Sequence, residues 1–131
     1  MSRLTNLGPG DISDRLTILA LKILVGQEKG RDVAHFQTEQ TALLQQIRSR
    51  TLNGIWFEQV LELAAVNGQL WQAEDQLRGY RVASEGDINR FSELVLVAQC
   101  AFRIQSLNDR RAELVTLINA NAGENVGAEK L

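Results

Sequence analysis

The sequence has little of several residues that metal sites and catalytic sites need. Its 131 residues include one cysteine, one histidine, one proline and one methionine. A single cysteine excludes an intrachain disulfide, and with a single histidine it excludes a Cys₂His₂ or Cys₄ zinc site within one chain. A catalytic triad or a cysteine–histidine pair would have to use His35, and no nucleophile motif surrounds that residue. We therefore expect no catalytic residues, no metal site and no cofactor.

The sequence also lacks a large excess of either charge and a long apolar run. It has 14 basic and 16 acidic residues, for a formal net charge of −2, whereas nucleic-acid-binding surfaces usually carry an excess of basic residues. The most apolar stretch, residues 16–25, includes Lys22 and is shorter than the roughly 20 residues that cross a bilayer. Residues 1–10 do not have the basic-then-apolar order of a signal peptide. We expect a cytoplasmic protein that binds no nucleic acid and does not insert into a membrane, and a single cysteine agrees with a reducing compartment.

The residues that are abundant favour helix and one folded domain. Hydrophobic residues make up 44% of the chain and charged residues 23%, close to the average of globular proteins. The length fits a single domain over residues 1–131, and Leu, Ala, Gln, Glu and Arg all have high helix propensity. Apolar residues recur at intervals of three and four. The pattern predicts helices over 9–26, 32–50, 53–80 and 88–119, followed by an irregular tail at 122–131.

Local signals support the starts of these helices. Pro9 suits a first helical turn because its missing N–H would be unpaired there, and Asp32 and Asn53 are good N-cap residues. Residues 84–87 are typical of a turn. The fourth helix would be roughly 48 Å long at 1.5 Å per residue, and the short turn before it places the third helix antiparallel to it. We predict an all-α fold, a bundle of about four helices built on a long antiparallel C-terminal hairpin.

Polar residues stand on three of these helices where the helical repeat calls for apolar ones. The third helix carries Asn67 and Glu74, the fourth carries Asn108 and Arg111, and Lys22 is the only charge in its apolar stretch. An unpaired buried polar group costs a few kcal/mol, so these residues are expected to satisfy one another. They would form a closed network that sets the helix register or a pocket for a small anionic ligand, and the third alternative is that they are exposed to solvent. The candidate residues of such a pocket are Arg15, Lys22, Asn67, Glu74, Asn108 and Arg111.

Three other features lead to expectations about packing. Gly68 lies in the middle of the third helix, where it costs roughly 1 kcal/mol relative to alanine, so it predicts the close approach of another helix. Trp56 and Phe57 are adjacent, so either one of them points outward or both are buried in the cap region of the bundle. Lys22 is expected either to extend its ammonium group to solvent or to meet a carboxylate, with Glu74, Asp75 and Asp109 as candidate partners.

Three segments together resemble a small bacterial all-helical family of unknown function. GPGDISDRLTILALK at 8–22 is similar to its opening G-E-L-x-D-K-L-T-I-L-x-x-K motif, VNGQLWQAEDQLR at 66–78 to its V-N-x-x-L-W-x-x-E-D motif, and LNDRRA at 107–112 to its N-D-R-R-A motif. The order and approximate spacing match over about four-fifths of the chain, although Arg15 stands where lysine is more usual. The resemblance implies a helical fold and a link to bacterial surface-polysaccharide synthesis, but no reaction.

These observations lead to two functional hypotheses. The first is a non-enzymatic helical interaction or assembly module, a homodimer or the partner of another helical protein, because a long hairpin exposes more surface than a shorter helical pair can cover. The alternative is a binding protein or enzyme for an anionic small molecule, such as a sugar phosphate or nucleotide sugar, with an interhelical polar pocket. An open cleft at Lys22, Asn67 and Asn108 would favour the second hypothesis, and mutual hydrogen bonding without a cavity would favour the first.

Overall fold

The structure is a computed structural model that describes residues 7–84 and 90–121, with the side chains of 7–80 and 92–121. Over these residues it consists of four helices without a strand, so the predicted all-α fold is confirmed. The helices are α1 (Pro9–Glu28), α2 (Ala34–Arg48), α3 (Gly54–Ser84) and α4 (Arg90–Asn121). Residues 85–87 of the predicted turn and the predicted tail at 122–131 lie outside the described residues.

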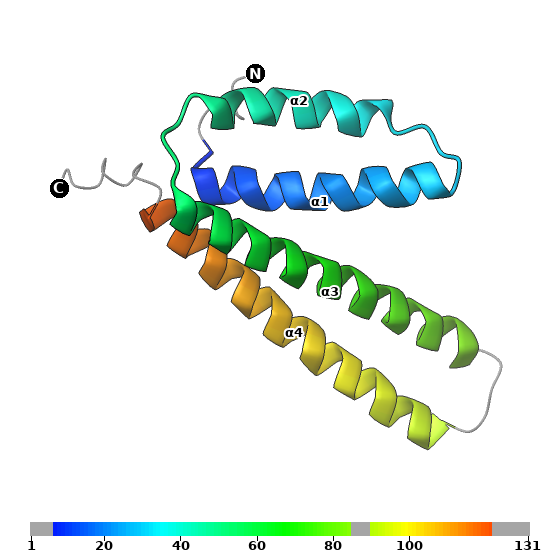
Figure 1. Ribbon diagram of the computed structural model, residues 1–131. Coiled ribbons are helices and arrows are strands. Elements are labelled where there is room, and N and C mark those ends of the chain that lie inside the picture. The colour runs from blue at the N-terminus through cyan, green and yellow to red at the C-terminus, as the bar shows by residue number, and fades with distance from the viewer. Residues whose placement is uncertain (1–6, 85–89, 122–131) are drawn as a thin grey trace.

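The helices form two antiparallel hairpins, α1–α2 and α3–α4, which meet at one end of the molecule (Figure 1). Helix α1 packs against the other three helices, whereas α2 packs mainly against α1. From the shared end the two hairpins diverge, so α1 covers only part of the longer one. We call residues 54–70 and 104–121 the near half of the α3–α4 hairpin, and residues 71–84 and 90–103 the far half.

Local chemistry explains where the helices begin. Asn53 caps α3 as predicted, because its Oδ1 accepts a hydrogen bond from the Trp56 N–H at 3.0 Å. Helix α2 begins two residues later than predicted: Val33 is its N-cap, and the Asp32 carboxylate accepts the Ala34 N–H at 2.9 Å instead. Gly30 turns the chain between α1 and α2 with a φ of 71°, which costs glycine little.

Glycine permits the close contact between α1 and α4. The Gly10 N–H donates to Asn119 Oδ1 at 2.7 Å, and a Cβ on Gly10 would overlap the backbone carbonyl of Val115. The prediction for Gly68 was wrong, because a Cβ there would meet nothing within 4 Å. The helix contact that requires glycine is therefore at the start of α1 and not in the middle of α3.

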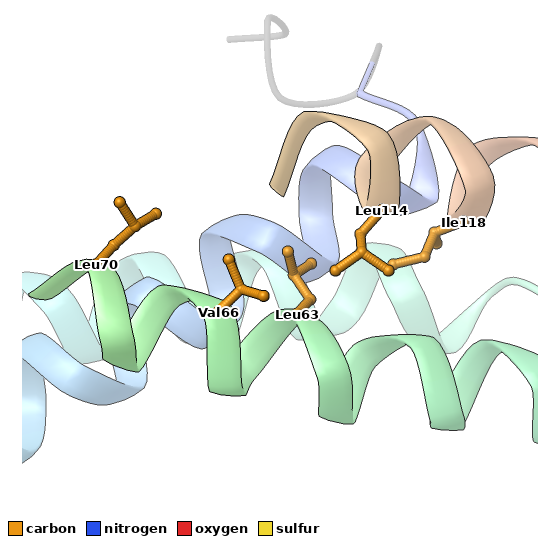
Figure 2. Close-up of a cluster of buried hydrophobic side chains, with 5 residues drawn as sticks. All are labelled: Leu63, Val66, Leu70, Leu114 and Ile118. Atoms are coloured by element: carbon orange, nitrogen blue, oxygen red, sulfur yellow. The ribbon is translucent and has the colours of Figure 1, made fainter. Parts of the chain in front are cut away.

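Two apolar clusters form the core of the described residues. Figure 2 shows the first, which lies in the near half and comprises Leu63, Val66, Leu70, Leu114 and Ile118. The second joins α1 to α2 and comprises Ile12, Leu19, Leu43 and Ile47. Trp56 packs against both clusters and so connects the two hairpins. Each fully buried aliphatic side chain contributes about 1.5–3 kcal/mol relative to an exposed one, so stability is concentrated at the end where the hairpins meet.

Candidate functional site

A single carboxylate on α1 connects three helices. Arg111 of α4 donates to Asp14 from Nε to Oδ1 at 2.9 Å and from Nη2 to Oδ2 at 2.6 Å. Asn67 of α3 donates from Nδ2 to Asp14 Oδ1 at 2.9 Å and to Thr17 Oγ1 at 2.8 Å. The Thr17 hydroxyl donates in turn to the Asp14 backbone carbonyl at 2.8 Å. Asp14, Thr17, Asn67 and Arg111 therefore form one hydrogen-bonded network, which we call the Asp14 network.

The Asp14 network is mostly shielded from water. The Asp14 side chain is 12% exposed and that of Arg111 is 36% exposed. The hydrogen bond to Asp14 is the main cause that raises the pKa of Arg111, helped by the charges of Asp14 and Glu74 and opposed by burial. The bidentate contact between Arg111 and Asp14 is the strong form of an arginine–carboxylate pair. Arg111 is therefore a charged residue whose guanidinium is already engaged within the protein.

Beside this network is a hollow of about 180 Å³ between α1, α3 and α4, which we call the polar hollow. Five of the six residues predicted for an anion pocket line it: Lys22, Asn67, Glu74, Asn108 and Arg111. The sixth, Arg15, lies elsewhere, because its Nε donates to Glu39 of α2 at 2.6 Å. Both proposed arrangements are thus present in part, a hydrogen-bonded network and an open hollow next to it.

The five residues of the polar hollow differ in burial. Asn67 is buried, Lys22 and Arg111 are half-buried, and Glu74 and Asn108 are exposed. The expectation that Glu74 and Asn108 lie in the interior was wrong, because both side chains are exposed although they line the hollow beside α1. The polar hollow therefore has a buried floor at Asn67 and a solvent-exposed rim.

Lys22 has a different partner from those predicted. Its Nζ lies 5.4 Å from the centre of the Phe36 ring, a cation–π contact with α2. Among the described residues it makes no salt bridge, so of the two arrangements expected for Lys22 the pairing with Glu74, Asp75 or Asp109 is not formed. Its ammonium group therefore remains available to a ligand.

Sequence reasoning did not include Asp14 among the candidate site residues, although Asp14 is the centre of the network. A signal for it was present: Asp14 and Thr17 are three residues apart and so share a helix face, within a segment that contains the buried Ile12 and Leu19. An arginine on an apolar stripe also needs a nearby carboxylate. These two arguments together could have found the pair.

A second hollow, of about 380 Å³, lies between α1, α2 and α3 and is apolar apart from Ser13 and Thr17. We call it the apolar groove. Its lining residues are Ser13, Leu16, Thr17, Ala20, Leu21, Leu24, Leu44, Ile47, Trp56, Val60 and Ala64. The Trp56 Nε1–H donates to Ser13 Oγ at 3.1 Å, so the indole nitrogen is satisfied within the groove wall.

Large apolar side chains are exposed in the wall of this groove and at the α3 positions next to it in the sequence. Leu24 is 53% exposed, and Phe57 and Leu61 are each 55% exposed. Phe57 and Leu61 follow the wall residues Trp56 and Val60 by one position, so they lie on the next strip around α3. The expectation that one of Trp56 and Phe57 points outward is confirmed, since Trp56 is half-buried and Phe57 is exposed.

Other clusters of side chains offer less chemistry. In the described part of the chain no group of three or more His, Cys, Asp or Glu side chains could hold a metal ion. Glu62 is paired with Arg110, which also donates to Glu113 at 2.7 Å. None of the described helices is long and apolar enough to cross a membrane.

No family model, curated protein or solved structure matches this chain. The resemblance to a bacterial helical family therefore stays a prediction based on three motifs. Each of those motifs contributes to the Asp14 network: Asp14 and Thr17 come from the first, Asn67 from the second and Arg111 from the third. The segments that carry the resemblance are thus the ones that hold α1 on the α3–α4 hairpin.

Proposed function

We propose that this protein is a non-enzymatic helical assembly module that forms a homodimer through the apolar groove. One observation carries the proposal: an apolar groove of about 380 Å³ is lined by the exposed Leu24, and the exposed Phe57 and Leu61 follow its wall residues Trp56 and Val60 on α3. Exposed apolar side chains gathered on one face are characteristic of an interaction site.

A second copy of the chain suits this surface because the same face carries both a hollow and a ridge. Twofold dimers use one patch on both subunits, so a residue that protrudes must meet a recess on the same patch. Phe57 and Leu61 form the ridge, and the small side chains of Ala20 and Ala64 line the recess. Two copies related by a twofold axis could each place the ridge in the groove of the other.

The size of the surface is compatible with a stable dimer. Such interfaces bury about 800 Å² on each partner and draw on roughly 20–30 residues a side, with an apolar centre and a polar rim. Eleven residues line the groove, and the exposed Phe57 and Leu61 lie next to its wall residues Trp56 and Val60 on α3. Polar neighbours on α2 and α3 would complete the rim.

The Asp14 network supports the same proposal by a structural route. The groove is formed by α1, α2 and α3, so its shape depends on how α1 sits on the longer hairpin. The network joins α1 to α3 through Asn67 and to α4 through Arg111. A closed network of this kind would preserve the groove without taking part in chemistry.

The alternative hypothesis of an anion site in the polar hollow has less support. Of its two basic residues, Arg111 is engaged by Asp14, and Glu74 adds a negative charge at the rim. The hollow therefore has no clear surplus of positive charge with which to attract an anion. A link to bacterial surface-polysaccharide synthesis rests on the resemblance alone.

The oligomeric state tests the proposal. We expect the wild-type chain to have about twice its monomer mass of 14.6 kDa in light scattering over a concentration series. Leu61→Glu should give the monomer mass with unchanged helix content, because Leu61 is exposed within the chain. Phe102→Glu is the matched control, since Phe102 is 72% exposed but lies in the far half. A monomeric wild type, or a dimer that survives Leu61→Glu and dissociates with Phe102→Glu, would contradict the proposal.

A further inference from the structure

A third hollow, of about 460 Å³, lies where the α1–α2 turn faces α3. We call it the basic cleft, because its described lining includes four residues with a positive charge, Lys22, Lys29, Arg31 and Arg78, and two with a negative charge, Asp32 and Asp75. The chain as a whole carries a net charge of −2. Positive charge is therefore concentrated here against the overall sign, which creates a local field that attracts anions.

The two acidic residues of the cleft are already engaged. Asp32 accepts the Ala34 N–H at 2.9 Å, and Asp75 accepts from Arg78 at 3.1 Å in a largely exposed pair. Lys22, Lys29 and Arg31 make no salt bridge with any carboxylate that the structure describes. Glu39, whose pKa the charge of Lys22 helps to lower, is bound by Arg15. At least three cationic groups are thus free to meet a ligand.

Aromatic side chains complete the lining of the cleft. Trp71 of α3 and Phe36 of α2 are both half-buried, and His35 stands beside Phe36 with ring centres 3.9 Å apart. Trp71 and Lys22 also line the polar hollow, so the two hollows meet at these residues. An aromatic surface beside free cations suits a ligand that carries both a planar ring and an anionic group.

We propose that the basic cleft binds a nucleoside phosphate, with the phosphate among Lys22, Lys29 and Arg31 and the base against Trp71. The volume of about 460 Å³ is within the range of small-ligand sites, roughly 300–1,000 Å³. A small ligand is favoured over a nucleic acid because the cleft holds only four of the 14 basic residues and the chain as a whole is slightly acidic. The cleft shares no lining residue with the apolar groove, so this site does not depend on dimer formation.

Calorimetric titration of the wild-type chain with ADP tests the site. We expect saturable binding that weakens as salt is added. Lys22→Gln and Arg31→Gln should each lower the affinity about tenfold, since each removes a charge-assisted contact. Asp75→Asn should raise the affinity, because it removes an opposing charge and releases Arg78. Arg48→Gln, an exposed arginine of α2 that does not line the cleft, is the matched control and should leave the affinity unchanged.

Tryptophan fluorescence tests the contact between the base and the Trp71 ring. Trp56 and Trp71 are the two tryptophans of the chain, so the Trp56→Phe variant emits from Trp71 alone. We expect that emission to change on saturation with ADP. Inorganic phosphate should bind more weakly than ADP, and adenosine should not bind detectably. The proposal is overturned if ADP does not bind or if adenosine binds as well as ADP. It is also overturned if Arg48→Gln weakens binding as much as Lys22→Gln, or if a short single-stranded oligonucleotide binds more tightly than ADP through the same residues.

Discussion

The near and far halves of the α3–α4 hairpin are built from similar residues but differ in what covers them. In the near half α1 lies across both helices, five large apolar side chains form a core, and Asn67 and Arg111 bond to Asp14. In the far half the buried hydrophobic residues among those described are Ala73 and Cys100, and Leu94, Leu96 and Phe102 are exposed. The α3–α4 hairpin thus does not bury its own apolar residues by itself. The helix that packs across it, α1, decides which of them form a core.

The largest expected effect is that of truncating the core of the near half. Leu63 is fully buried, so Leu63→Ala should lower the free energy of unfolding by about 3–5 kcal/mol through lost burial and a cavity. Cys100→Ala, in the far half, should cost less than about 1.5 kcal/mol because it removes a single sulfur atom. Urea denaturation of both variants measures the difference. Equal losses would mean that the two halves contribute equally to stability.

Removal of the central carboxylate tests how α1 is held on the near half. Asp14→Ala should lower the free energy of unfolding by about 3 kcal/mol, because it leaves Asn67 and Arg111 without their shared acceptor. Breaking a buried ion pair costs about 3–5 kcal/mol, and the lower figure applies here because the Arg111 side chain is 36% exposed. Asp11→Ala, an exposed position one turn earlier, should cost less than about 1 kcal/mol. Similar losses from the two variants would show that the network adds little.

Two glycines distinguish a covered surface from an open one. Gly10→Ala should lower the free energy of unfolding by about 2 kcal/mol, since the new Cβ overlaps the Val115 carbonyl and α1 must shift. Gly68→Ala should instead raise it by about 0.5–1 kcal/mol, because alanine favours helix and the added Cβ has open space. Thermal unfolding measures both signs. A loss at Gly68 would indicate an interface there that the single chain does not contain.

The smallest expected effect concerns the pair that joins α1 to α2 away from the core. The hydrogen bond to Arg15 holds the pKa of Glu39 below its ordinary value of 4.5. A carboxylate whose pKa is lower in the folded state than in the unfolded state stabilises the fold at pH values above its unfolded-state pKa. This stabilisation is lost as the pH falls through the folded-state pKa, so the pair contributes fully above about pH 4.5. Glu39→Gln should cost less than about 1 kcal/mol at pH 7, because the pair is partly exposed. The cost should shrink below pH 4, and an equal cost at pH 7 and pH 3.5 in urea titrations would contradict this assignment.

Signals between neighbours in the chain were sufficient for the secondary structure. Pro9 begins α1 and Asn53 caps α3 because each acts on the backbone within three residues of itself. Asp32 shows the limit of such signals: its carboxylate accepts an N–H as an N-cap would, but α2 begins after Val33. The predicted and observed starts of α2 therefore differ by only two residues, because the contacts that set them are local.

The burial and partners of single side chains, which depend on tertiary packing, were predicted less well. Asn67 and Asn108 stand at similar polar interruptions of an apolar stripe, but only Asn67 is covered by α1. For Lys22 the sequence offered solvent or a carboxylate, and its ammonium group lies over the Phe36 ring of α2. The periodicity of one helix shows which residues share a face but not which length of that face a neighbour reaches.

By itself the sequence determined that this chain is helical, with a long C-terminal hairpin and without the residues of a zinc or disulfide site. These properties follow from composition and from contacts a few residues apart along the chain. Only the tertiary structure decided that Asp14 is the centre of a three-helix network, and that α1 borders an apolar groove on one side and a basic cleft on another. The reason is that the crossing of α1 depends on contacts such as Gly10 with Val115 and Asp14 with Arg111, which join residues about a hundred positions apart.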